Sequence, residues 1–244
     1  MGTFTLEADR LTKRYGTRRA VDTLSFTTAP GDVLGLLGPN GAGKTTTIRL
    51  LTTILEPTSG DFSVAGVPAS KPTEIRRRIG VLPERTGYPP HQTGEGFLRY
   101  HARLYGQSKH AANDTAERLL AEVGLTERGG TLIGTYSRGM RQRLGIARAL
   151  VNDPAVVFLD EPALGLDPAG QVQVGALIRQ IARRGTTVVV STHTLHDVEE
   201  LCTSVLILDR GKILVAGTPA DVTRDAGVTR LSEAFLAMTG TDPR

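Results

Sequence analysis

The sequence of 244 residues predicts an α/β fold, in which a mainly parallel β-sheet carries an inserted lobe of α-helices. Two observations lead to this fold class. Short runs rich in Val, Ile and Leu alternate with helical patterns along much of the chain, which is typical of strands buried in a parallel sheet. Between about residues 89 and 151 strand-like runs are almost absent and helical patterns dominate. We therefore expect the interior of the chain to form a helical lobe within the α/β core.

The individual elements follow from these patterns. The expected strands are the apolar runs at residues 33–38, 156–159, 187–190 and 205–208. In the lobe, apolar residues at helical spacing predict helices over 96–105, 111–123 and 139–151. A last helix is expected over 228–240, packed on the core through apolar residues at helical spacing, namely Leu231, Phe235, Leu236 and Met238.

Composition limits the function classes. Hydrophobic residues make up 39% and charged residues 22%, which is ordinary for one large globular domain or a core with an inserted lobe. Cys202 is the single cysteine, so a reducing compartment fits best. No run approaches the roughly 20 apolar residues of a membrane-spanning helix, and no secretory signal is expected. The net charge of +4 comes from basic residues scattered among acidic ones, so no nucleic-acid partner is expected.

Residues 38–45 match the phosphate-binding pattern GxxxxGK[ST], between a strand-like run and the helix-competent segment 46–51. Glycines let the backbone N–H groups point at phosphate oxygens, and the following helix adds its positive N-terminal end. We expect Lys44 to reach the β- and γ-phosphates and the Thr45 hydroxyl to bind Mg²⁺. A chance glycine-rich turn is the alternative, which the flanking elements disfavour. The predicted phosphate cradle comprises Gly38, Pro39, Asn40, Gly41, Ala42, Gly43, Lys44, Thr45 and Thr46.

A second candidate lies far downstream, where the apolar run 155–159 ends in Asp160 and Glu161. A buried parallel strand delivers Asp160 to the sheet edge at which ligands collect, where its carboxylate can hold Mg²⁺ directly or through water. Glu161 is expected to point elsewhere and to act as general base on the attacking water. Alone, such a strand end is usually a solvated terminus, but together with the phosphate cradle it indicates nucleotide hydrolysis.

Residues 136–140, Tyr-Ser-Arg-Gly-Met, complete a set of motifs by which the chain resembles the nucleotide-binding subunit of the ATP-binding-cassette (ABC) superfamily over nearly its whole length. The resemblance implies a P-loop NTPase (RecA-like) core with an N-terminal antiparallel β portion. It divides the single domain 1–244 into a core of about 1–86 and 152–220, a helical lobe of about 87–151 and a helical tail of about 221–244.

The resemblance also implies roles for residues that no local chemistry identifies. Ser137 and Gly139 match the signature residues that contact ATP bound to a partner cassette, although by itself the segment resembles an ordinary helix cap. Tyr15 matches the aromatic residue that stacks on adenine, and residues 164–167 match the D-loop that couples two sites. His193 matches the switch histidine that senses the γ-phosphate. A lone Tyr or His in such positions is more often structural.

The departures from the family pattern are specific. Glu84 stands where the Q-loop usually has Gln; its carboxylate can still bind Mg²⁺ but adds negative charge beside ATP. Arg138 replaces a glycine of the signature, Tyr136 and Met140 replace its Leu and Gln, and Ala163 stands where many members have a small hydroxyl residue. Glu84, the signature and the C-terminal segment 231–240 resemble the ABC-2-type exporters and their drug-resistance relatives.

The resemblance implies an ATP- and Mg²⁺-dependent ATPase that powers transport, with export as the expected direction. The expected partners are a separately encoded membrane permease and a second cassette, in a homodimer or a pair with a related chain. The expected location is cytoplasmic, peripheral on the inner face of the cell membrane. The alternatives are a soluble ATPase of the superfamily acting on ribosomes or DNA, and a binding-only cassette, against which Lys44, Asp160, Glu161 and His193 argue.

Overall fold

The structure, a computed structural model that describes residues 4–239, contains a six-stranded and a four-stranded sheet. The larger sheet has the order β10-β9-β3-β8-β7-β6, in which all neighbours are parallel except β10 and β9. Its strands are β3 (Val33–Leu37), β6 (Ile79–Leu82), β7 (Val156–Asp160), β8 (Thr187–Thr192), β9 (Ser204–Asp209) and β10 (Lys212–Gly217).

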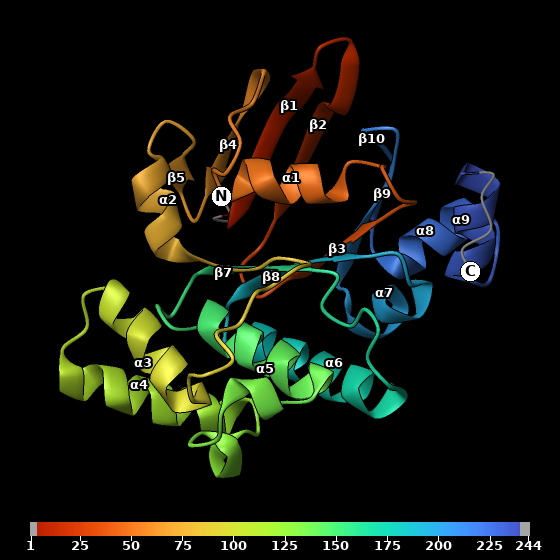
Figure 1. Cartoon of the computed structure of the whole chain (residues 1–244). Coiled ribbons are helices and arrows are strands. Elements are labelled where there is room, and N and C mark those ends of the chain that lie inside the picture. The colour runs from red at the N-terminus through yellow and green to blue at the C-terminus, as the bar shows by residue number, and fades with distance from the viewer. Residues whose placement is uncertain (1–3, 240–244) are drawn as a thin grey trace.

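The smaller sheet is antiparallel, as expected for the N-terminal part of the chain. Its order is β2-β1-β4-β5. The strands are β1 (Leu6–Tyr15), β2 (Arg18–Thr28), β4 (Ser59–Val64) and β5 (Val67–Pro68). Figure 1 shows helix α1 (Lys44–Leu51) between the two sheets, and α2 (Pro72–Arg78) beside β5.

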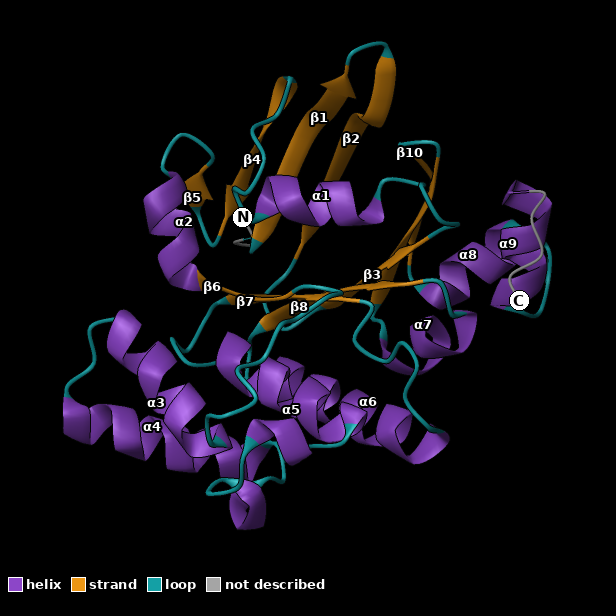
Figure 2. Cartoon of the chain, in the orientation of Figure 1, coloured by secondary structure: helices purple, strands orange, loops and turns teal. Residues whose placement is uncertain are grey.

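The other face of the large sheet is covered by helices α3 (Gly94–Leu104), α4 (Lys109–Glu122), α5 (Arg138–Ala149) and α6 (Pro168–Arg183) (Figure 2). Alternation along β7 explains how one sheet serves two cores: Phe158 packs toward α1 and the antiparallel sheet, whereas Val157 and Leu159 pack toward α5 and α6. Strand β7 is therefore apolar on both faces, which is why it reads as a continuous apolar run.

The inserted lobe lies between β6 and β7 and holds α3, α4, α5 and two short 3₁₀ turns, Thr126–Arg128 and Ile133–Thr135. The sequence predicted these three helices within two residues at each end. Thr93 and Ser108 begin α3 and α4, because each side chain accepts a hydrogen bond from a backbone N–H of the first turn. The fold class is confirmed, while the division of the chain at residues 87 and 151 stays a prediction.

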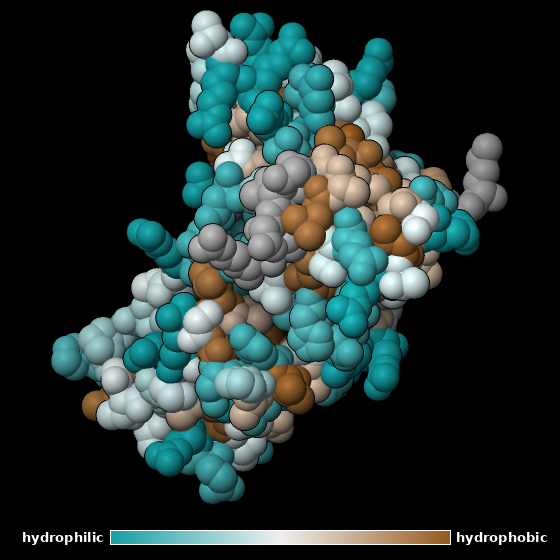
Figure 3. Space-filling model, turned by 90° about the vertical axis from the view of Figure 1, so that its right-hand side faces the viewer, coloured by the Kyte–Doolittle hydropathy of each residue, from teal (hydrophilic) through white to brown (hydrophobic). Residues whose placement is uncertain are grey.

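The C-terminal part carries α7 (Leu195–Leu201), α8 (Pro219–Asp225) and α9 (Leu231–Thr239). Leu231 and Phe235 of α9 are buried in a small core with Leu37 and Ile207 of the large sheet, and Met238 packs against it, so the expected docking of this helix is found. Leu236, expected in the same contact, is instead 39% exposed. Position 240, the end of the expected helix, lies outside the described residues. Figure 3 faces this side of the molecule, where hydrophobic residues form small groups between hydrophilic ones.

Candidate active site

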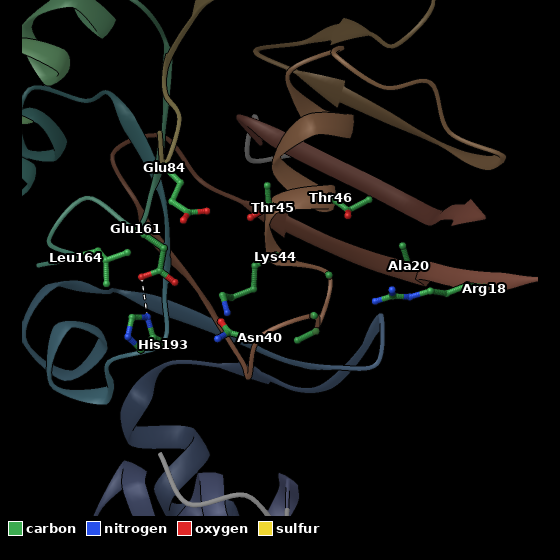
Figure 4. A pocket seen from close by; sticks show the side chains of 13 residues that line it. Arg18, Ala20, Asn40, Lys44, Thr45, Thr46, Glu84, Glu161, Leu164 and His193 are labelled. Atoms are coloured by element: carbon green, nitrogen blue, oxygen red, sulfur yellow. Dashed lines mark hydrogen bonds and ion pairs between the residues drawn. The ribbon is translucent and has the colours of Figure 1, made fainter. Parts of the chain in front are cut away.

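A cavity of about 360 Å³ opens at the carboxyl ends of β3, β7 and β8. This is the edge at which parallel α/β sheets bind their ligands. Five separate chain segments meet there: strand β2, the loop after β3 with the start of α1, the residue Glu84 after β6, the residues after β7, and the residue after β8 (Figure 4). Of the sequence-predicted site residues, the cavity is lined by Asn40, Gly41, Ala42, Gly43, Lys44, Thr45, Thr46, Glu84, Glu161 and His193.

The loop 38–43 wraps closely against strand β2. Gly43 has φ +110, and a Cβ there would lie 2.6 Å from the carbonyl oxygen of Ala20, so this position requires glycine. With no side chain between them, the loop and β2 form one continuous wall of the cavity. The backbone N–H groups of Lys44 and Thr45, at the start of α1, have no earlier turn to bond to and are free to bind an anion.

Lys44 is buried and folds back on its own loop. Its Nζ donates to the carbonyl oxygen of Gly38 at 2.6 Å and to that of Pro39 at 3.3 Å. Burial lowers the pKa of Lys44, and the nearby carboxylates of Glu161, Asp160 and Glu84 act in the opposite direction. A phosphate group entering the cavity would meet a cation that at present has only carbonyl partners.

Asp160 ends strand β7 and is buried against two hydroxyl groups. Ser191, which pairs with it across the β7–β8 register, donates to its carboxylate, and the Thr45 hydroxyl lies 3.3 Å from the same Oδ1 atom. Asp160 lines a neighbouring cavity of about 390 Å³, which Thr45 and Glu84 line as well. Their side-chain oxygen atoms are the kind of ligands that Mg²⁺ prefers.

A magnesium ion usually takes one or two protein oxygens and completes its shell with water and substrate phosphates. Within residues 4–239 no group of three or more His, Cys, Asp or Glu side chains is placed to hold a metal by itself. The pairing of Thr45 with Asp160 beside the phosphate cradle fits a nucleotide-bound Mg²⁺.

Glu161 follows Asp160 at the end of β7 and lines the nucleotide cavity, whereas Asp160 lines the neighbouring one. The Glu161 φ of +51 lies in the left-handed region that is costly for a side-chain-bearing residue. The backbone N–H of Glu161 is held by Ser191, donating to the carbonyl oxygen at 3.1 Å and lying 3.0 Å from Oγ. This fixed turn sends the carboxylate into the cavity and not along the strand.

His193 meets Glu161 in the cavity. Its Nδ1 atom lies 2.9 Å from Oε2 of Glu161 (Figure 4). Burial raises the pKa of Glu161, while the charge and hydrogen bond of His193 and the charge of Lys44 lower it in part. The segment that carries His193 is itself braced, because the Thr192 hydroxyl binds Asp197 at 3.0 Å.

Six predicted residues do not line this cavity, namely Tyr15, Gly38, Pro39, Ser137, Gly139 and Asp160, the last of which lines the neighbouring cavity. Tyr15 ends β1 with 49% of its surface exposed, and Nζ of Lys13 lies 5.6 Å from its ring centroid. Ser137 and Gly139 lie at the start of α5, where the Ser137 hydroxyl caps the helix by accepting from the Met140 N–H at 3.2 Å. In one chain, therefore, the signature segment and the phosphate cradle are separate.

Sequence reasoning missed three residues that line the cavity: Arg18, Ala20 and Leu164. Arg18 and Ala20 are two residues apart on β2 and therefore lie on the same face of the strand, the one that faces the cavity (Figure 4). A basic residue at the start of a strand carries no sequence signal for this position. Leu164 lay in a recognised segment, residues 164–167, but its contribution to the cavity wall depends on the turn after β7.

No helix among the described residues 4–239 is both long and apolar enough to cross a membrane. A family model described as "ABC transporter" matches residues 21–164. Among solved structures, one titled "Structure of ATP binding subunit of ABC transporter" is 31% identical, with a TM-score of 0.86, covering 97% of this chain and all of that one.

Curated relatives agree with the family model. The Nod factor export ATP-binding protein I of Burkholderia pseudomallei is 39% identical over 215 residues, covering 88% of this chain and 71% of its own length. The daunorubicin resistance ATP-binding protein DrrA2 of Streptomyces coeruleorubidus is 36% identical over 245 residues, covering 100% of this chain and 76% of its own length. The chain belongs to the ABC transporter family, as an ATP-binding subunit that hydrolyses ATP.

Proposed function

We propose that two copies of this chain, or this chain and a related cassette, hydrolyse ATP to drive export through a separately encoded membrane permease. The observation that carries the catalytic part is the convergence of Lys44, Glu161 and His193 from three segments on one cavity. Export is supported by the relatives, which are an export protein and a drug-resistance protein. The proposed place of action is the inner face of the cell membrane.

In the proposed site the triphosphate lies on the loop 38–46. Lys44 leaves the Gly38 and Pro39 carbonyls to bind the β- and γ-phosphates, at a cost that the phosphate charge offsets. Thr45 and Asp160, with Glu84 nearby, would hold Mg²⁺, which would supply positive charge beside the phosphate oxygens.

Glu161 is the proposed general base. Its carboxylate accepts a proton from water as the water oxygen bonds to the γ-phosphorus and the bond to the β–γ bridging oxygen breaks, giving ADP and phosphate. The Nδ1 atom of His193, 2.9 Å from Oε2, keeps that carboxylate in the cavity. The other ring nitrogen can donate its N–H to the γ-phosphate when the ring is the doubly protonated imidazolium, in which both nitrogens are donors. The raised pKa of Glu161 suits a base, because a more basic carboxylate is a better proton acceptor at neutral pH.

Base and ribose recognition fall to the hairpin between β1 and β2. Tyr15 and Arg18 pair in its register, so an adenine ring stacked on Tyr15 places its sugar and α-phosphate toward Arg18. Within residues 4–239 the Arg18 guanidinium makes no hydrogen bond or ion pair, whereas Arg19 is paired with Asp22 at 2.9 Å. We assign Arg18 to the nucleotide site as an unpaired cation over the loop.

A dimer is proposed because Ser137 and Gly139 lie outside the cavity of their own chain. Their free N–H groups at the start of a 12-residue helix suit a phosphate from a second molecule. In a head-to-tail pair each nucleotide is then enclosed by the cradle of one chain and the signature of the other.

The permease is proposed to dock in the cleft between core and lobe. A cavity of about 380 Å³ there is lined by Ile54 and Val81 of the core and by His101 and Tyr105 at the end of α3. Ile54 is 65% exposed and Tyr105 45% exposed, and Leu104 adds a further exposed apolar side chain. This apolar cleft borders Pro83 and the segment to Glu84, so a docked cytoplasmic segment lies beside the nucleotide site.

The first experiment tests catalysis and pairing together. Glu161→Gln removes the proton acceptor but keeps the size of the side chain, so we expect turnover to fall by a factor of about 10² or more. ATP should still bind and should now hold a persistent dimer, measured by light scattering after gel filtration. A monomeric variant with full turnover would overturn both assignments.

The second experiment tests the partner. Co-purification with the membrane protein encoded beside this chain should be lost in Ile54→Glu and Tyr105→Glu, while basal ATP hydrolysis is kept. Val172→Glu is the matched control, since Val172 is a 69% exposed apolar residue on α6. If the unmodified chain retains no membrane protein but ribosomes or DNA stimulate its turnover, the transport proposal fails and the ATPase remains.

A further inference from the structure

Arg138, which stands where the family signature usually has glycine, reaches back to the catalytic loop of its own chain. Its Nη2 donates to the carbonyl oxygen of Leu164 at 2.7 Å. The guanidinium lies over Gly165, where a Cβ would come within 2.6 Å of its Cζ and Nη1 atoms. Gly165 has φ +68, so both its backbone and its missing side chain allow this approach. The contact spans 26 positions of sequence and joins the lobe to the core.

The receiving loop leads directly to the proposed base. Leu164 lines the nucleotide cavity, and its N–H donates to the carbonyl oxygen of Glu161 at 3.2 Å. One short turn therefore connects the carbonyl that Arg138 holds with the residue that activates water. Glu161 is the strained end of this turn, at φ +51, so small movements of the turn change where its carboxylate points.

The other end of the contact is the signature. Arg138 is the first residue of α5 and stands between Ser137 and Gly139, the residues proposed to touch the nucleotide of a partner chain. A movement of these two residues must carry Arg138 with it, because all three belong to the first turn of one helix. The Arg138 side chain thus extends from the signature residues, which are proposed to touch the partner's nucleotide, toward the nucleotide cavity of its own chain.

We propose that Arg138 is a positioning residue that couples the two nucleotide sites of the dimer through a single chain. Nucleotide bound by the partner fixes Ser137 and Gly139, Arg138 transfers that position to the Leu164 carbonyl, and the turn after β7 sets Glu161 for hydrolysis. The inference rests on the proposed dimer and adds to it the route by which one site senses the other. A glycine at this position has no side chain to make the link, so other members need a different route.

The test compares Arg138→Ala with Arg138→Lys and Arg141→Ala. Arg141 is a matched control, because it lies one turn later on α5 and its guanidinium makes no hydrogen bond or ion pair within residues 4–239. ATP hydrolysis by the purified full chain is measured against ATP concentration. For Arg138→Ala we expect kcat to fall about fivefold or more and the Hill coefficient to fall from about 2 toward about 1.

Two further readouts separate coupling from loss of structure. Binding of ATP to the monomer in EDTA and the melting temperature should match the unmodified chain for Arg138→Ala. Lysine can still donate to a carbonyl oxygen, so Arg138→Lys should recover part of the Hill coefficient.

The outcomes are distinguishable. An Arg138→Ala variant with unchanged kcat and Hill coefficient would overturn the coupling role and leave the proposed ATPase dimer intact. Equal losses of kcat and Hill coefficient in Arg141→Ala would overturn the coupling role as well. They would show that the positive charge on α5, and not the contact with the Leu164 carbonyl, is responsible. If the unmodified chain does not hydrolyse ATP and the Glu161→Gln variant does not form a dimer, the proposed function fails. This inference then fails with it.

Discussion

The Nδ1 atom of His193 lies 2.9 Å from Oε2 of Glu161, although the two residues are 32 positions apart in the sequence. The contact joins the ends of β7 and β8, which are neighbours in the sheet. Burial raises the pKa of Glu161 and His193 opposes that rise. The pair thus sets both the direction and the basicity of the proposed base.

This balance predicts the acid limb of the pH profile. A base must be deprotonated to act, so kcat/KM falls as pH drops through the pKa of Glu161 in the free protein. Since that pKa is raised, the limb should lie above the ordinary glutamate value of about 4.3. Removing His193 removes a group that lowers the pKa, so in His193→Ala the limb should move to higher pH.

The measurement is a series of kcat/KM values across the acid range for both proteins. His110→Ala is the control, because His110 forms a similar pair with Asp114 at 2.8 Å on the exposed surface. A limb that stays in place or moves to lower pH in His193→Ala would contradict the assignment.

Lys44 should provide much of the affinity for the triphosphate. In Lys44→Ala the buried ammonium and its place over the Gly38 and Pro39 carbonyls are lost, so ATP should bind at least about tenfold more weakly. Isothermal titration calorimetry measures this directly. Lys71→Ala serves for comparison, because Lys71 is an exposed lysine paired with Glu74 at 3.2 Å. Undiminished binding in Lys44→Ala is the result that counts against the phosphate cradle.

Arg18 should contribute a smaller, salt-sensitive share. Its guanidinium is exposed, so we expect Arg18→Ala to weaken ATP binding about fivefold at low salt, or roughly 1 kcal/mol, and less as salt rises. Binding of adenosine, which has no phosphate, should change little. Arg19→Ala removes the same charge from the neighbouring residue, whose partner is Asp22. Equal effects of the two substitutions would show that net charge alone is responsible.

Glu84 should oppose binding of nucleotide in the absence of metal. Its carboxylate lines the cavity beside Lys44, where it repels phosphate charge. Glu84→Gln should therefore tighten ATP binding in EDTA about twofold to fivefold at low ionic strength. The gain should shrink at high salt, because the side chain is exposed to solvent. Weaker binding under both conditions would mean that the carboxylate has a structural role.

Much of the fold could be predicted because its signals are local. Strands of the large sheet are apolar on both faces, so residues 33–38 or 187–190 stand out without any knowledge of their neighbours. The edge strand β10 was not predicted, since its residues alternate between exposed and half-buried. The strand order and the place of α1 between two sheets depend on contacts distant in sequence, which no local pattern contains.

For the site, the sequence by itself indicated the phosphate cradle and the acidic strand end. Both signals lie within a few consecutive residues, the glycine spacing of one loop and a carboxylate directly after an apolar strand. Tertiary structure alone decided that Arg18 faces the cavity, that His193 meets Glu161, and that Arg138 reaches the Leu164 carbonyl. Each of these depends on how separate strands and helices pack. The distances between these side chains depend on the packing of the whole core, whereas a sequence motif describes only residues that are close together in the chain.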